Sequence, residues 1–323
     1  MVVDRLIKRM RELGAPIVVG LDPRMDEIPE YIKENSKSYL LELNPYMTET
    51  EQKMTDFVNA FWSVCYRNFL QEIIDSIHGL VPAVKLQSAM FERFGHSGVS
   101  CYHYLVHYAT SKLLTVIGDI KRSDIASSAE AYSAGHIGFD NMMDYVTSHS
   151  PVHFVTLNPY LGKDSIDPFI SDCKKFDRGL FVLVKTSNKG SADIQDVLLD
   201  NGKPLYTHVA KLVSNWGEDS TGEYGYSRVG AVVGATHPSE ALEIRKLMPH
   251  TFFLVPGYGA QGASGKDLKD LWIKESYGMI VNSSREITGA YQSDRFKTEE
   301  YDFAKAAKEA VIAMKDDLGA YMP

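Results

Sequence analysis

Eight short runs of apolar and β-branched residues recur along this chain of 323 residues, and they constrain its fold more than any other feature. The runs occupy residues 17–23, 81–87, 114–121, 154–160, 180–186, 229–235, 251–257 and 278–284. They are nearly continuous apolar stretches rather than alternations of apolar and polar residues, which is typical of parallel strands covered on both faces. The pattern therefore predicts eight buried strands.

Segments of helical period separate these runs. Apolar residues repeat every three or four positions between 57 and 77 and again between 205 and 216. Helix-start patterns agree: a capping box at Thr48 and Glu51, a first-turn proline at Pro238, and Thr298 before Glu299 and Glu300. Eight strand–helix units predict an α/β fold, most simply a single (β/α)8 TIM barrel over residues 1–323. An open doubly wound sheet is the alternative with the same unit count.

The link between the first predicted strand and its helix, residues 24–51, is unusually long. It carries two prolines and two asparagines, Pro29, Asn35, Asn44 and Pro45. Weaker polar stretches occur near 188–203 and 217–228. Because each stretch joins two units of the same repeat, we interpret all three as insertions on one barrel rather than as linkers between domains.

Composition excludes several classes of partner. Apolar residues make up 44% of the chain, enough for a large core, while the net charge of −8 and the lack of a Lys/Arg block argue against nucleic acid or an anionic membrane surface. The longest apolar run, 180–184, is too short to span a bilayer, and the first residues lack the apolar stretch of a signal peptide. We therefore expect a cytoplasmic protein. Its three cysteines, without a C-x-x-C motif, predict reduced packing residues.

Polar and charged residues cluster where the predicted strands end. These residues are Asp22, Lys85, Gln87, Asp119, Lys121, Asn158, Lys185, Thr186, Ser187 and Asn188. In a barrel the carboxyl ends of all strands meet at one face, and active sites of this fold lie on that face. Solvated charges scattered at random would have no reason to prefer these ends. The distribution therefore predicts an active site at the carboxyl-terminal mouth of the barrel.

The segment from Asp119 to Asp124 is the most informative part of this cluster. Side chains alternate along a strand, so Asp119 and Lys121 point to the same side, and Asp124 follows just beyond the turn. With Lys85 from the neighbouring strand, two cations would alternate with two anions, which offsets the burial of each charge. A lone D-x-K-x-x-D is more often a structural ion pair, but its place at the barrel mouth beside Lys85 favours a function.

A second group lies after the seventh and eighth predicted strands, where many barrels of this fold hold a phosphate. Residues 256–262 are rich in glycine and include Gln261, and residues 282–285 end in Arg285. Backbone N–H groups and a guanidinium would suit a phosphate, whereas glycine turns with a solvated Arg285 are the alternative. The loop also matches G-x-G-x-x-G, but it lies in the seventh unit and opens into another polar turn. We therefore reject a dinucleotide site.

No pattern in the sequence predicts a metal site or a serine nucleophile. The ten histidines include no H-E-x-x-H motif, and His103 and His107 on a predicted helix lack a neighbouring carboxylate. Surface or packing roles suit these two histidines better. Ser123, Ser127 and Ser128 are not part of a G-x-S-x-G motif.

Taken together, these segments resemble the orotidine 5′-phosphate decarboxylase family. The resemblance rests on Asp22-Pro23, Lys85, the run Asp119-Ile120-Lys121-Arg122-Ser123-Asp124, the run Gly257-Tyr258-Gly259-Ala260-Gln261-Gly262, and Ser284-Arg285, in this order. It runs from about residue 22 to residue 285. The D-x-K-x-x-D motif with an upstream lysine is typical of the wider superfamily, and residues 84–87 and 185–188 resemble its longer-chain, type 2-like branch.

The resemblance implies decarboxylation of orotidine 5′-monophosphate to uridine 5′-monophosphate, the last step of pyrimidine nucleotide synthesis, without a metal or organic cofactor. It implies that Lys121 protonates C6, that Asp119 lies against the departing carboxylate, and that Lys85 and Asp124 complete the charge array. The implied contacts are Asp22 and Gln87 with the ribose, Ser187 with the pyrimidine, Gln261 and Arg285 with the phosphate, and Asn158 as a further substrate contact. Asp124 would serve the partner subunit's site, which implies a homodimer with shared active sites.

Two other functions remain open from the sequence. A metal-dependent phosphosugar decarboxylase or aldolase of the same superfamily would need a further acidic ligand on the second strand, where this chain has Lys85-Leu86-Gln87. A non-catalytic protein that binds a nucleotide phosphate could keep the barrel, although the intact Lys-Asp-Lys-Asp set argues against it.

Overall fold

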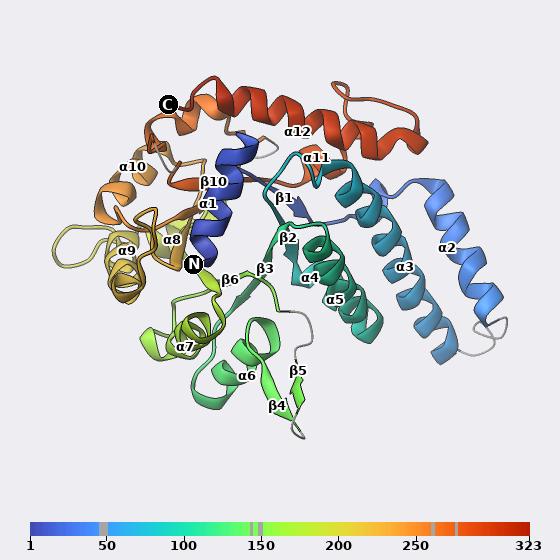
Figure 1. Ribbon diagram of the computed structural model, residues 1–323, viewed down its shortest axis with the longest axis horizontal. Helices are drawn as coiled ribbons and strands as arrows, with labels where there is room; N and C mark the ends of the chain where they lie inside the picture. Colours follow the sequence, from blue (N-terminus) through green and yellow to red (C-terminus); the bar gives the residue numbers. More distant parts are fainter. Residues whose placement is uncertain (45–50, 143–144, 148–150, 260–261, 275–276) are drawn as a thin grey trace.

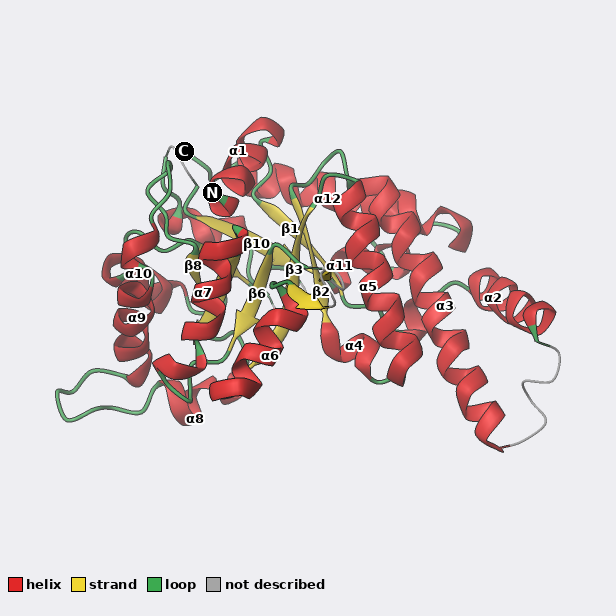
Figure 2. Ribbon diagram, turned by 60° about the horizontal axis from the view of Figure 1, so that its bottom comes forward, coloured by secondary structure: helices red, strands yellow, loops and turns green. Residues whose placement is uncertain are grey.

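Eight parallel strands close into a barrel in the order β1-β10-β9-β8-β7-β6-β3-β2 (Figure 2). The computed structural model describes residues 1–44, 51–142, 145–147, 151–259, 262–274 and 277–323. The barrel strands are β1 (Ile17–Leu21), β2 (Ala83–Gln87), β3 (Thr115–Arg122), β6 (Phe154–Leu157), β7 (Gly179–Lys185), β8 (Val229–Val233), β9 (Phe253–Val255) and β10 (Met279–Ser283). Every predicted run coincides with one strand. The predicted (β/α)8 TIM barrel is therefore confirmed, and the open sheet is excluded.

Helices surround the barrel (Figure 1). They are α1 (Val2–Leu13), α2 (Glu30–Leu43), α3 (Glu51–Ile77), α4 (Ser88–Glu92), α5 (Gly95–Ser111), α6 (Ala126–His136), α7 (Asp167–Phe176), α8 (Ala192–Gln195), α9 (Leu205–Trp216), α10 (Pro238–Leu247), α11 (Arg285–Thr288) and α12 (Phe303–Gly319). A 3₁₀ helix, η5 (Gly265–Leu271), links β9 to β10, and a hairpin of β4 (Asp140–Met142) and β5 (Tyr145–Thr147) precedes β6. Within the described ranges, no helix has both the length and the apolarity needed to cross a bilayer.

Some of the predicted helix starts hold, and others do not. The two periodic segments lie in α3 and α9, and α10 begins at Pro238, as predicted. A 3₁₀ turn, η7 (Glu300–Asp302), follows Thr298, so α12 begins later than the start pattern predicted. Thr48 and Pro45 lie outside the described residues. The three cysteines are free and buried, as predicted.

The insertion after β1 contains a helix that its sequence pattern did not reveal. α2 follows Pro29 and buries Ile32, Ser36 and Leu40 against α3. These residues recur every four positions along one helical face, but a serine occupies the middle position. The apolar stripe is therefore too short and too polar to recognise by period, and Asn35, read as a loop residue, lies within the helix. Both helices extend to one side of the barrel (Figure 2).

The inside of the barrel is divided into an apolar and a polar half. Inward side chains near the amino ends of the strands form an apolar cluster with one face of α1; the members include Val18, Ile117, Phe154, Phe181, Ile280, Leu6, Ile7 and Met10. α1 therefore closes the amino-terminal end of the barrel with its apolar stripe. Near the carboxyl ends, the inward positions carry polar residues instead. The polar part of the barrel interior therefore lies at its carboxyl-terminal mouth.

A buried carboxyl joins the segment after β1 to α11. Glu27, at the end of the 3₁₀ helix η1 (Met25–Glu27), is 3% exposed. Burial raises the pKa of Glu27 to about 7, although the Thr288 hydroxyl at 3.1 Å and the Arg24 guanidinium at 3.8 Å favour the charged form. The Tyr291 hydroxyl also donates to the Glu27 carbonyl oxygen at 3.2 Å. Glu27 therefore binds its proton more tightly in the folded chain than in the unfolded chain.

We expect Glu27→Gln to remove one source of pH-dependent stability. A raised carboxyl pKa stabilises the fold below about pH 4.5, and this stabilisation is lost as pH rises through the folded value of about 7. The free energy of unfolding of the variant, relative to that of the original chain, should therefore increase from pH 5 to pH 8 by an amount on the order of 3 kcal/mol at most. Urea unfolding at both pH values measures this gain. Parallel stability curves for the two proteins would contradict the assignment.

Candidate active site

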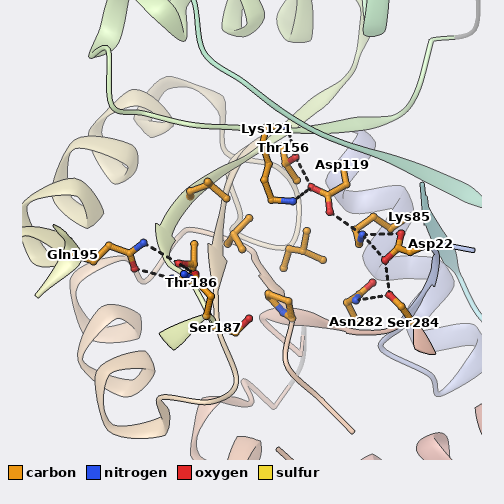
Figure 3. Close-up of a pocket in the computed structure, with 15 residues that line it drawn as sticks. Asp22, Lys85, Asp119, Lys121, Thr156, Thr186, Ser187, Gln195, Asn282 and Ser284 are labelled. Carbon is orange, nitrogen blue, oxygen red and sulfur yellow. Dashed lines mark hydrogen bonds and ion pairs between the residues drawn. The ribbon is translucent and has the colours of Figure 1, made fainter. Parts of the chain in front are cut away.

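A cavity of about 430 Å³ opens at the carboxyl-terminal mouth of the barrel. Its lining combines the polar strand ends with a few apolar side chains: Asp22, Lys85, Asp119, Lys121, Thr156, Leu183, Thr186, Ser187, Asn188, Gln195, Val232, Leu254, Pro256, Asn282 and Ser284. Figure 3 shows charged residues on one side of the cavity and the turn after β7 on the opposite side. An occupant would therefore lie between a charged wall and a polar turn.

Asp119 is the centre of the charged wall. Its Oδ2 lies 2.8 Å from Lys85 Nζ and its Oδ1 lies 2.6 Å from Lys121 Nζ. The Thr156 hydroxyl donates to Oδ1 at 2.8 Å, and Gln87 Nε2 donates to Oδ2 at 3.2 Å. Both carboxylate oxygens are thus fully engaged, which fixes the carboxylate plane and compensates for its burial.

The neighbouring charges set the ionisation of this cluster. Burial alone would raise the pKa of the Asp119 carboxyl, but the Lys85 and Lys121 ammonium groups outweigh it and hold that pKa well below its ordinary range. Burial also favours a neutral Lys85, yet Asp119 and Asp22 outweigh it and raise the Lys85 pKa above its ordinary value. With Asp22 and Lys121, the cluster holds two formal cations and two formal anions. Its charges therefore balance before any ligand enters.

The two lysines differ in access to the cavity. The Lys85 side chain is 6% exposed, whereas that of Lys121 is 44% exposed. Lys121 also has a left-handed backbone, with φ of 45°, and its N–H donates to Thr156 Oγ1 at 3.1 Å. The pairing of β3 with β6 shifts register between Gly118 and Arg122 at this point. The irregularity aims the Lys121 ammonium at the cavity, so it is the cation available to a ligand.

Asp22 connects the charged wall to the last strand of the barrel. Lys85 Nζ lies 3.5 Å from both Asp22 oxygens, and the Ser284 hydroxyl donates to Asp22 Oδ2 at 2.8 Å. A Cβ on Gly20 would lie 1.9 Å from the Ser284 hydroxyl oxygen, so only glycine leaves room for this contact. Asn282 Nδ2 reaches the same hydroxyl at 3.4 Å. The seam between β1 and β10 therefore forms part of the site.

The structure brings together some of the residues predicted from the sequence. Asp22, Lys85, Asp119, Lys121 and Ser187 all line the cavity, and Gln87 supports Asp119 from the neighbouring strand. Three of the four groups of the predicted charge array, Lys85, Asp119 and Lys121, therefore converge at the barrel mouth. Their roles in catalysis or binding stay predictions.

Other predicted residues do not reach this cavity within one chain. Asp124 accepts a hydrogen bond from the Ile125 N–H at 2.8 Å, and Asn158 accepts one from the Tyr160 N–H at 3.1 Å. Arg285 is exposed at the start of α11. Gln261 lies outside the described residues. None of the first three is among the residues that line the cavity.

The sequence reasoning missed several residues of the site. Thr156, which is 1% exposed and donates to Asp119, and Gln195 both line the cavity. Asn282 and Ser284, predicted only as part of the phosphate-binding segment 282–285, line it beside Asp22 instead. Thr156 could have been found, because it interrupts the apolar run of β6 at an inward position between Phe154 and Asn158. The contact from Ser284 to Asp22 had no local pattern, because it joins strands at opposite ends of the chain. Among the described residues, no group of three His, Cys, Asp or Glu side chains is placed to hold a metal ion.

Comparisons with known proteins agree with this geometry. Residues 16–301 match the model of the family described as orotidine 5′-phosphate decarboxylase / HUMPS. Orotidine 5′-phosphate decarboxylase from Caldicellulosiruptor bescii is 39% identical over 96% of this chain and 97% of its own length, and that from Clostridium tetani is 37% identical over 98% of each. The structure of Leishmania donovani OMP decarboxylase superposes with a TM-score of 0.64 at 27% identity, covering 98% of this chain and 99% of that one. The chain therefore belongs to the orotidine 5′-phosphate decarboxylase / HUMPS family.

Proposed function

We propose that this chain converts orotidine 5′-monophosphate to uridine 5′-monophosphate and carbon dioxide without a cofactor. The observation that carries the proposal is the Lys85–Asp119–Lys121 array, whose exposed ammonium faces a cavity at the barrel mouth. The relatives named orotidine 5′-phosphate decarboxylase support the same reaction. Because a charged nucleotide does not cross a bilayer unaided, we place the reaction in the cytoplasm.

Lys121 would supply both charge stabilisation and the proton. When the bond from C6 to the carboxylate breaks, its electron pair stays on C6 and carbon dioxide leaves. The resulting carbanion has no electron sink in the substrate, so a fixed positive charge must stabilise it. The Lys121 ammonium, held by Asp119 at 2.6 Å, then gives its proton to C6 and regains one from water.

Asp119 would orient Lys121 while remaining ionised. The low pKa that the two lysines impose on Asp119 keeps a carboxylate beside the site of the substrate carboxylate. The Asp119 carboxylate and the neighbouring substrate carboxylate repel each other, and loss of carbon dioxide relieves this repulsion. Binding energy from the remote phosphate would offset the unfavourable contact in the bound substrate. Lys85 would hold Asp119 from the buried side.

The remaining walls suit the rest of the nucleotide. We place the ribose hydroxyls near Asp22 and Gln87, and the phosphate near the 257–262 loop and Arg285, with Asn158 as a further contact. The pyrimidine edge would face Ser187. Among the described residues, none accepts a hydrogen bond from the Ser187 hydroxyl or backbone N–H, so both donors are available to a base. Gln261 would join the phosphate contacts.

We also propose that the chain works as a homodimer with shared active sites. Asp124 follows the turn after β3, and its carboxylate does not line the cavity of its own chain. A second copy could supply this carboxylate to Lys121 and complete the alternating charges. The one-chain geometry supports this arrangement because Lys121 keeps an exposed side and Asp119 is its carboxylate partner within the chain.

The proposal is tested by incubating the protein with orotidine 5′-monophosphate and following the loss of the substrate's ultraviolet absorbance. We expect turnover that continues unchanged in excess EDTA. Turnover that EDTA abolishes would instead favour a metal-dependent decarboxylase of the same superfamily. Tight binding of the nucleotide without turnover would identify a binding protein.

A further inference from the structure

The turn after β7 is held by a side chain rather than by the barrel ladder. The pairing of β7 with β8 shifts register between Leu183 and Lys185, and the Gly234 N–H donates to the Lys185 carbonyl oxygen at 2.8 Å. Beyond this bond the Thr186 N–H donates to Gln195 Oε1 at 2.9 Å. A side-chain amide therefore takes the position that a neighbouring strand would normally fill.

Gln195 grips Thr186 at two points. Its Nε2 donates to Thr186 Oγ1 at 2.8 Å, in addition to the bond that its Oε1 accepts. The Thr186 hydroxyl in turn donates to Asn188 Oδ1 at 2.7 Å. The carboxamide holds its N–H donors and its C=O acceptor in one plane, as a peptide group does, so it can replace a missing backbone partner. Figure 3 shows both Gln195 bonds beside the cavity.

A neighbouring ion pair anchors the helix that carries Gln195. Asp196, the residue after Gln195, pairs with Lys185, the residue before Thr186. The Lys185 ammonium is fully buried and lies 5.3 Å from the centre of the Tyr206 ring on α9. A buried ammonium with these partners is costly to move, because displacement would leave its charge unpaired. The end of β7 and the end of α8 are therefore fixed to each other through adjacent residues.

The two bonds from Gln195 to Thr186 and the ion pair between Lys185 and Asp196 fix the position of Ser187. A Cβ on Gly234 would lie 2.9 Å from the Ser187 backbone nitrogen, so β8 bounds the turn closely on one side. The Thr236 hydroxyl donates to the Ser187 carbonyl oxygen at 3.2 Å. On the other side the turn depends on Gln195. Held by β8 on one side and by Gln195 on the other, Ser187 faces the cavity opposite Asp22 and Lys85 (Figure 3).

We infer that Gln195 is a positioning residue for base recognition: through its two bonds to Thr186, it holds the Ser187 donors where they meet the edge of the pyrimidine. The inference rests on the proposed function. Uracil and cytosine differ at this edge, because uracil presents a carbonyl oxygen where cytosine presents an amino group. Donors held in fixed places can distinguish the two bases, whereas a loosened turn cannot.

Binding of product-like nucleotides to Gln195→Ala tests this inference. We expect the dissociation constant of uridine 5′-monophosphate to rise about tenfold, the effect of one or two lost hydrogen bonds, while that of cytidine 5′-monophosphate changes little. Affinity for ribose 5-phosphate, which lacks the base, should stay the same. In turnover, KM for orotidine 5′-monophosphate should rise while kcat is largely kept. Ile194→Ala is the matched control, because Ile194 lies on the same helix and is 53% exposed.

Two outcomes would overturn the inference while the proposed function stands. One is an unchanged preference for the uridine nucleotide in Gln195→Ala. The other is an equal loss of affinity for all three ligands, which would indicate a merely structural role. If the original chain does not turn over orotidine 5′-monophosphate, the proposed function fails and the inference fails with it. Should Gln195→Ala not fold, Thr186→Val removes the two bonds of the hydroxyl, to Gln195 and to Asn188, but keeps the backbone bond to Gln195, and we expect it to reduce the preference about threefold.

Discussion

Replacing Lys121 by alanine should abolish decarboxylation and leave binding of uridine 5′-monophosphate nearly unchanged. Both ammonium groups of the array line the cavity, but the Lys121 side chain is 44% exposed and that of Lys85 only 6%, so Lys121 is the group placed to stabilise and protonate the carbanion. A general acid that also stabilises charge should account for a loss in kcat of at least about a thousandfold. The product carries no charge at C6 and does not depend on Lys121. Steady-state kinetics and calorimetric titration measure the two effects.

The control for this variant is another exposed lysine. Lys163 pairs with Asp167 on the surface, away from the cavity, and Lys163→Ala should leave kcat unchanged. The backbone N–H of residue 121 still faces Thr156 Oγ1 in Lys121→Ala, so the local fold should persist and circular dichroism should match. Near-normal turnover by Lys121→Ala would remove Lys121 from the mechanism.

Mixing two inactive variants should restore activity if Asp124 serves the partner's site. Lys121→Ala and Asp124→Ala should each be nearly inactive as homodimers. After unfolding and refolding together, half of the dimers carry one of each chain, and in these dimers one site has both variant residues while the other is intact. The mixture should therefore regain about a quarter of the original activity. Turnover after co-refolding at equal concentrations measures this recovery.

A second mixture provides the negative control. Lys121→Ala and Asp119→Ala change residues that lie in the same cavity, so every site of a mixed dimer lacks one of them. This mixture should stay inactive. Failure of the Lys121→Ala and Asp124→Ala pair to recover, with mixed dimers shown to form, would place Asp124 outside the partner's site.

The barrel could be predicted because its strands carry strong local patterns. Runs such as 180–186 are almost wholly apolar, and parallel strands buried on both faces leave that pattern whatever their neighbours are. α2 could not be predicted, because its buried stripe is three residues long and contains Ser36. α1 also escaped prediction, since nothing in residues 2–13 indicates that the helix closes one end of a barrel.

The site was predictable to the extent that it follows from strand direction. Carboxyl ends of parallel strands converge, so Lys85, Asp119 and Lys121 had to meet once the strands were identified. Their hydrogen-bond partners were not predictable in the same way. Gln195 meets Thr186 just beyond a register shift in the pairing of β7 with β8, and the left-handed backbone of Lys121 accompanies a register shift in the pairing of β3 with β6. Such features depend on the closed barrel and leave no local trace in the sequence.

The hydrogen bond from Ser284 to Asp22 joins the first and the last strands of the barrel, so this part of the site forms only after both strands have been synthesised. A ribosome makes Asp22 early and Ser284 about 260 residues later. The charged wall of the cavity is therefore complete only after β10 has been synthesised. Until β10 docks against β1, Asp22 lacks its hydroxyl partner and the barrel has an open edge. A chain that ends before β10 therefore lacks both the hydroxyl partner of Asp22 and the strand that closes the barrel beside β1.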